Sequence, residues 1–212
     1  MIGSNSRKDK ITAFFDIGHR FVRLALLSAG GQEVAAYQSF SAGLSKGKVV
    51  DAVAFSKSIE QLLGLAQVEG ENLRAFVSVP MLQTRTLRRS IQHRCSGNYR
   101  STDYTSLQEA AIDSGSSDLD EVIDVYITQA WLDDKAVDPL SFGHAGRELR
   151  AQALLATHPK ILLADILTAF NSCGIEVAEF RSGYFGLARA LSTLRPGIEN
   201  AVLIDIGHTS VS

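Results

Sequence analysis

A chain of 212 residues is long enough for one large domain or two small ones. Hydrophobic residues make up 45% of it and charged residues 21%, which excludes a disordered chain, a coiled-coil rod and a collagen-like repeat. The net charge of −2 creates no strong overall field toward nucleic acid or an anionic membrane surface. No apolar run approaches the roughly 18 residues that span a bilayer, and the two cysteines, Cys95 and Cys173, indicate no disulfide framework. These properties predict a cytoplasmic protein.

The first third of the chain has an α/β pattern. Residues 1–10 are polar and basic without an apolar core, so they predict a disordered lead and not a secretory signal. Three strand-like runs follow between residues 11 and 40, separated by glycine turns. Asp51 then suits a helix N-cap, and apolar residues at helical spacing continue to Gly70. Residues 73–79 form a further strand, so this part predicts a mixed sheet with a helix on one face.

The pattern changes between residues 81 and 155. An arginine-rich strand comes first, and the spacing of Thr105 and Gln108 fits a capping box that opens a short helix. Two β-rich runs follow, so the order is strand–helix–strand–strand. The predicted elements are 84–95, 106–113, 121–132 and 147–156. Such a unit can bury one sheet face against its helix, and we predict an inserted α+β subdomain.

The α/β pattern resumes at residue 156. Its predicted elements are a helix that Gly174 closes, a strand at 175–180, a helix at 183–194 that Ser182 caps, and a buried strand at 201–207. Because the two α/β parts flank the insertion, we predict a discontinuous domain of residues 11–80 and 156–212. Its fold class is α/β, with a mixed five-stranded sheet.

One short motif occurs twice. Asp-Ile-Gly-His stands at residues 16–19 and again at 205–208, each time after an apolar strand. A carboxylate at a strand end can hold a hydrated magnesium ion, and a glycine lets backbone N–H groups approach phosphate oxygens. A single Asp-x-Gly is more often a plain hairpin turn, so the hypothesis rests on the repetition. His19 and His208 lack a third ligand for a metal site and suit turn histidines.

The motifs resemble the N-terminal half of bacterial cell-division proteins of FtsA type, in the actin/Hsp70/sugar-kinase ATPase superfamily. DIGHRFVRLALL is similar to the first phosphate motif of that family, and VLIDIGHTSVS to the second. GLSKGKVVD resembles the glycine-rich segment before its first helix, and DPLSFGHAGRELRAQ the passage that ends its inserted SHS2 domain. The resemblance covers residues 11 to 212 and implies an actin-like, ribonuclease H-like fold.

The resemblance also implies a nucleotide site between two turns. The residues bordering the phosphates would be Asp16, Gly18, His19 and Arg20 on one side, and Asp205, Gly207, His208 and Thr209 on the other. Asp205 would contact Mg2+ through a water molecule. His208 stands where the family usually has a glycine, and Phe21 narrows the room for phosphate. Because the chain ends at Ser212, inside the second turn, we expect ATP and Mg2+ to bind the full-length protein and this half only weakly. We expect at most a weak ATPase, with no catalytic residue assigned.

The implied role is that of a cell-division adaptor. Such a protein helps to tether FtsZ filaments to the inner membrane and recruits later division proteins, with nucleotide acting as a conformational ligand. It would lie at the inner face of the plasma membrane at the division site, held by a C-terminal segment that this chain lacks. We expect no nucleic-acid partner.

Opposite charges mark the inserted subdomain. Arg85, Arg88 and Arg89 begin a basic run, and an acidic stretch follows from Asp113 to Asp138. A solvated strand face is the plain explanation of the basic run. The alternative is self-association through the inserted subdomain, because patches of opposite sign can steer two copies together.

Two other functions share parts of this pattern. An actin-fold protein of PilM type, from pilus or secretion assembly, has the inserted subdomain, and a pilus partner in place of FtsZ would favour it. A remnant of a sugar-kinase-like phosphotransferase shares the phosphate turns. That enzyme needs a catalytic carboxylate and a sugar pocket, and the sequence shows neither clearly.

Overall fold

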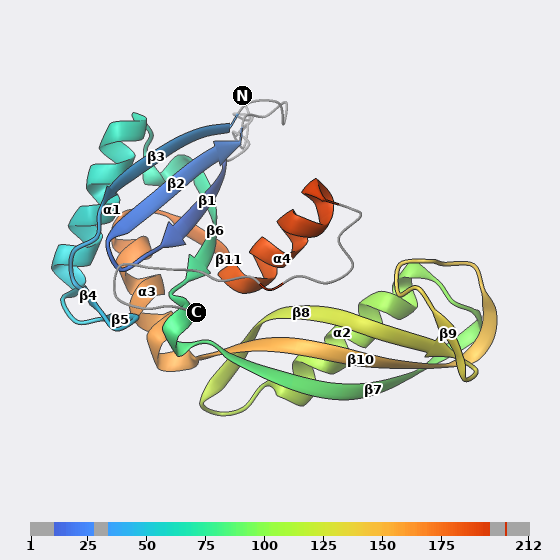
Figure 1. The fold of residues 1–212 in the computed structure, drawn as a ribbon. Coiled ribbons are helices and arrows are strands. Elements are labelled where there is room, and N and C mark those ends of the chain that lie inside the picture. The colour runs from blue at the N-terminus through green and yellow to red at the C-terminus, as the bar shows by residue number, and fades with distance from the viewer. Residues whose placement is uncertain (1–10, 28–33, 196–201, 203–212) are drawn as a thin grey trace, which may run out of the picture. The chain divides into compact units, whose positions relative to one another are not determined.

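Figure 1 shows the computed structural model of the chain, which describes residues 11–27, 34–195 and 202. The chain divides into two compact units. Unit 1 consists of Met1–Gln83 and Ile161–Ser212, and unit 2 consists of Thr84–Lys160. The predicted lead at 1–10 and the predicted strand at 201–207 lie outside the described residues, apart from Val202, which is exposed.

Unit 1 is built on a mixed five-stranded sheet of order β11-β6-β1-β2-β3. Its strands are β1 (Ile11–Ile17), β2 (Phe21–Leu27), β3 (Val34–Phe40), β6 (Leu73–Val79) and β11 (Glu176–Ser182). The first three strands pair antiparallel, whereas β6 pairs parallel with both β1 and β11. This sheet confirms the predicted fold class. A two-stranded ribbon of β4 (Leu44–Ser45) and β5 (Lys48–Val49) precedes the first helix.

Helices cover one face of this sheet. Helix α1 (Ala52–Ala66) and helix α3 (Lys160–Ser172) lie on that face in Figure 1, and their rings meet those of the sheet. Phe170 of α3 packs edge-on against Phe15 of β1, with 4.9 Å between the ring centroids, and lies 6.5 Å from Phe55 of α1. The three rings are all at most 2% exposed, so they form the centre of the core of unit 1.

Two helix ends follow from local sequence. The Asp51 carboxylate accepts a hydrogen bond from the backbone N–H of Ala54 at 3.0 Å, which confirms Asp51 as the N-cap of α1. Helix α4 (Gly183–Leu194) begins after Ser182 as predicted, but the Ser182 side chain forms no capping hydrogen bond, and no residue of α4 is buried. None of the described helices is both long enough and apolar enough to span a membrane.

Unit 2 is an antiparallel sheet with one helix on its inner face. The strands are β7 (Arg85–Asn98), β8 (Asp120–Leu132), β9 (Lys135–Val137) and β10 (Ala145–Pro159), in the order β7-β10-β8-β9. Helix α2 (Ser101–Gly115) presents Leu107 and Ala111 to a core that includes Leu149, Leu155 and Tyr99. The strand–helix–strand–strand order of the sequence is therefore present, with the three-residue strand β9 in addition.

The predicted start of α2 at Thr105 is wrong, because the helix begins at Ser101. The Asp103 carboxylate accepts the backbone N–H of Arg100 at 2.8 Å and so caps the helix earlier in the chain. Thr105 lies inside the helix, where its hydroxyl donates to the carbonyl of Ser101 at 3.2 Å. A threonine inside a helix commonly forms this bond to the preceding turn.

Candidate functional site

The described half of the candidate site is the turn between β1 and β2. The backbone N–H of Gly18 donates to the carbonyl of Phe21 at 3.0 Å, so His19 and Arg20 form a two-residue hairpin turn. A Cβ at Gly18 would lie 2.8 Å from that carbonyl oxygen. The glycine is therefore required by the close approach of the Phe21 backbone within the same turn.

Asp16 lies at the end of β1, on the sheet face opposite α1 and α3. Its carboxylate forms a 2.7 Å ion pair with the guanidinium of Arg23, its cross-strand neighbour on β2. Both side chains are about half exposed. Sequence reasoning missed Arg23, although the turn at Gly18 fixes the antiparallel register that places it opposite Asp16. The pair gives the corner a guanidinium that can offset phosphate charge.

Arg20 and Arg23 gather over one aromatic ring. Their guanidinium carbons lie 5.3 Å and 5.8 Å from the centroid of the Phe21 ring, which is within the range of a cation–π contact. The ring of Phe40, at the end of β3, lies 5.1 Å from that of Phe21. The turn is thus bordered by two positive side chains that an aromatic pair supports.

The structure brings together Asp16, Gly18, His19 and Arg20 in this one turn. Their predicted counterparts lie outside the described residues: Asp205, Gly207, His208 and Thr209. The described half consists of a close glycine turn bordered by the guanidinium groups of Arg20 and Arg23. A magnesium contact at Asp205 stays a prediction. Within the described part of the chain, no three histidine, cysteine or acidic side chains are grouped so as to hold a metal.

The predicted interaction residues lie on β7 of unit 2. Arg85 and Arg88 are exposed, whereas Arg89 is half-buried. The Nε of Arg89 donates to the carbonyl of Ser114 at 3.2 Å and one terminal nitrogen donates to the carbonyl of Arg88, so this guanidinium is held between β7 and the end of α2.

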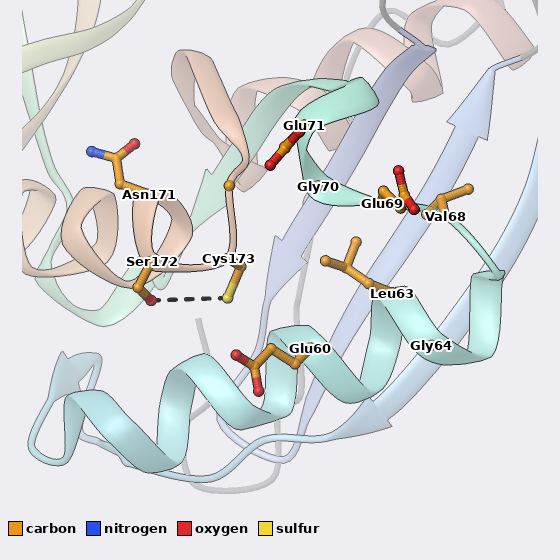
Figure 2. Close-up of a pocket in the computed structure, with 11 residues that line it drawn as sticks. Glu60, Leu63, Gly64, Val68, Glu69, Gly70, Glu71, Asn171, Ser172 and Cys173 are labelled. Atoms are coloured by element: carbon orange, nitrogen blue, oxygen red, sulfur yellow. Dashed lines mark hydrogen bonds between the residues drawn. The ribbon is translucent and has the colours of Figure 1, made fainter.

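A groove of about 730 Å3 opens in unit 1, away from the β1–β2 turn. Figure 2 shows Glu60 and Leu63 of α1 on one wall and residues 171–173 at the end of α3 on the other. Three glutamates line it, with no histidine, lysine or arginine among the lining residues. Burial raises the pKa of the Cys173 thiol, whose Sγ lies 3.5 Å from the carbonyl of Ser56. Cys173 is therefore a packed thiol and not an activated nucleophile.

Comparisons with known proteins identify the fold. No family model matches the chain, and no curated protein matches it. A chain of the PilM–PilN type IV pilus biogenesis complex is similar over 97% of this chain and 57% of its own length, with a TM-score of 0.58 and 17% identity. A Bacteroides thetaiotaomicron protein of unknown function with an actin-like ATPase fold aligns over 92% of this chain and 60% of its own, with a TM-score of 0.39 and 5% identity. This chain therefore spans less than two thirds of either neighbour, and it has the fold of the aligned part of the PilM–PilN chain.

Proposed function

We propose that this chain is the actin-fold part of an adaptor in a membrane-associated assembly of the type IV pilus biogenesis class. The likeness to the PilM–PilN complex over 97% of the chain carries the proposal. That coverage includes most of unit 2, so the likeness extends beyond the five-stranded sheet to the inserted α+β unit. The adaptor would act at the inner face of the plasma membrane, with a protein of PilN type as its partner.

Nucleotide would act in this adaptor as a conformational ligand. The turn at Gly18 and the guanidinium groups of Arg20 and Arg23 support a phosphate contact on the side of β1 and β2. Asp205 and its neighbours would supply the opposite side, with ATP and Mg2+ bound by the full-length parent protein. A ligand held between two turns shifts the population of states that differ in its contacts.

A direct binding experiment tests the partner. The purified parent protein is immobilised and presented, with and without ATP and Mg2+, to the purified PilN-type protein and the purified FtsZ of the same organism. We expect saturable binding of the PilN-type protein and none of FtsZ. Binding of neither protein, by a parent that folds, would overturn the proposal.

The second candidate is a division adaptor of FtsA type, which the motif resemblances at residues 16–27 and 43–51 favour. Its partners would be FtsZ and later division proteins, and its place the division site. Saturable FtsZ binding in the same experiment, together with a midcell position of a fluorescent fusion, would select it. A coupled assay that detects phosphate transfer to a sugar or an acid would exclude both adaptors and select a kinase-like enzyme.

A further inference from the structure

The groove between the ends of α1 and α3 carries only negative charge. Its charged lining residues are Glu60 on α1, and Glu69 and Glu71 on the segment that leads into β6 (Figure 2). All three are exposed. Glu69 accepts a hydrogen bond from the side chain of Asn72 at 3.3 Å, which leaves its charge unpaired. The described ion pairs of arginine involve other acidic residues, so no described arginine or lysine is paired with these carboxylates.

Two helix ends add to this negative charge. The groove is lined by residues 63–64 near the C-terminus of α1 and by residues 171–172 at the C-terminus of α3. A helix C-terminus carries a partial negative charge that favours a cation nearby, and neither helix has a basic residue in its last turn. Leu63 and Val68 also line the groove, and they offer an apolar surface to the aliphatic part of a lysine or arginine side chain. The groove therefore suits a basic segment of chain.

The register of the sheet brings such a segment to the groove. Strand β1 pairs parallel with β6, and its first residue, Ile11, lies opposite Leu73. Glu71 precedes Leu73 by two residues, so the chain that leads into Ile11 arrives beside the groove. The last four residues of that lead carry three positive charges and one negative charge: Arg7, Lys8, Asp9 and Lys10.

The distances allow direct contact. Neighbouring strands lie about 4.8 Å apart, and two residues of chain span at most about 7 Å, so Ile11 lies within about 12 Å of Glu71. The stretch from Lys8 to Ile11 covers about 10 Å when it is extended, and the lysine side chain covers the rest. The lead can therefore reach the glutamates of the groove without any change in the sheet.

We propose that the basic segment of residues 7–10 binds in this groove, with its lysines beside Glu69 and Glu71. The segment has no apolar side chain to bury, so charge complementarity decides where it binds. It acts as an intramolecular strap across the end of unit 1 where β1 and β6 begin. A basic segment of another protein would have to displace this strap in order to enter the groove.

The strap is held by exposed ion pairs, which are individually weak and depend on salt. Its tether to β1 compensates, because a short link keeps the segment at an effective concentration of about a millimolar beside the groove. Salt at about 1 M reduces the range of the attraction to about 3 Å. We therefore expect the segment to be bound at low salt and released at high salt.

Limited proteolysis of the 212-residue chain tests the proposal, because trypsin cleaves after arginine and lysine. Mass spectrometry follows the rate of cleavage after Arg7 at low salt. We expect Glu69→Gln/Glu71→Gln to raise this rate about fivefold, the factor that corresponds to the loss of one good exposed ion pair. The control Glu109→Gln/Asp113→Asn removes two charges from exposed positions of α2 and should leave the rate unchanged.

Circular dichroism confirms that each variant is folded, and Glu71→Gln alone replaces the double variant if that one does not fold. Equal cleavage rates in the wild type and the groove variant would contradict the proposal. Protection of the wild type that increases with protein concentration would show that the segment binds a second copy, and would contradict the intramolecular strap as well. None of these results bears on the pilus-adaptor proposal, whose readout is binding to a different protein.

Discussion

Two glycines of unit 1 have different structural roles. At Gly18 a Cβ would lie 2.8 Å from the carbonyl oxygen of Phe21, whereas at Gly64, inside α1, a Cβ would meet nothing within 4 Å. We expect Gly18→Ala to lower the free energy of unfolding by about 1–3 kcal/mol, because the turn must shift. Gly64→Ala should raise it by about 0.5–1 kcal/mol through helix propensity. Urea unfolding followed by circular dichroism measures both changes. A lower free energy of unfolding in both variants would show that the cost at Gly18 does not come from its close approach to Phe21.

The Asp16–Arg23 pair separates stability from ligand binding. Because both side chains are about half exposed, Arg23→Gln should change the free energy of unfolding by less than about 1 kcal/mol. If the phosphates of ATP lie at this turn, the same change should weaken ATP binding to the parent protein about fivefold, since a charge contact worth about 1 kcal/mol is lost. Calorimetric titration with ATP and Mg2+ measures this.

Arg74→Gln is the matched control for that titration, because Arg74 lies on β6 over the ring of Phe76 and away from the turn. It should leave ATP affinity unchanged. Equal ATP affinity of the Arg23 variant and the wild type would show that the phosphates do not lie at the β1–β2 turn.

His158 makes the stability of unit 2 depend on pH. Burial lowers the pKa of His158 to about 4 from 6.5, while the Asp120 carboxylate acts in the opposite direction. Between these values the unfolded chain binds more protons than the folded one, so stability is lost as the pH falls from about 6.5 toward 4. The loss reaches about 1.4 kcal/mol per pH unit at most.

His158→Asn removes this titration and should flatten the pH dependence of the unfolding free energy in that window. His144→Asn, at an exposed position, should keep the wild-type slope. Urea unfolding at several pH values measures the slopes, and equal slopes for the wild type and the His158 variant would refute the assignment.

At the scale of single elements, the start of α2 depends on one carboxylate. Asp103 is 8% exposed, accepts the N–H of Arg100 at 2.8 Å and lies 2.9 Å from the Nε2 of His93. Asp103→Ala should lower the free energy of unfolding by about 2 kcal/mol, because a cap and a buried partner are lost together. Asp113→Ala, exposed on the same helix, should change it by less than about 0.5 kcal/mol. Similar losses in thermal unfolding would contradict this cap.

The elements show how far sequence periodicity predicts this fold. The predicted helix at 183–194 coincides with α4, since apolar spacing and flanking residues mark both ends. The predicted helix start at Thr105 was wrong, because Asp103 is a second candidate for capping the helix. Only the structure shows that the Asp103 carboxylate accepts the backbone N–H of Arg100. Strand β9 was not predicted, since three residues carry no periodicity.

The candidate site was predicted only in part. The turn residues Asp16 to Arg20 follow from a short motif, and the structure gathers them at one hairpin. Arg23 could be placed beside Asp16 only from the register of the sheet, which the motif does not contain.

At the scale of the whole molecule, the actin-like fold follows from the order of elements, whereas the choice between pilus and division adaptors does not. That choice depends on partner surfaces, and two proteins of one fold can differ there completely.

The two units should fold separately. The core of unit 2 contains only residues of unit 2, among them Tyr99, Leu107 and Leu155. Its ends are held together, because Thr84 Oγ1 lies 3.2 Å from His158 Nδ1 and β7 begins opposite the end of β10. An excised chain of residues 84–160 should therefore melt cooperatively, with the helix and strand content of α2 and its sheet, although a domain of this size is marginally stable.

The same geometry predicts that unit 1 tolerates removal of the insertion. The chain enters unit 2 at Thr84 and leaves it at Lys160, and these two ends lie close together. A short Gly-Ser linker can therefore join Gln83 to Ile161, and the remaining chain should keep its five-stranded sheet. Far-ultraviolet circular dichroism and thermal melting of both pieces measure this. Leu155→Asp in the excised unit places a charge in its core and should abolish the melt. Two pieces that are each unfolded would instead show that the chain is one cooperative domain, in which the insertion supports the sheet it interrupts.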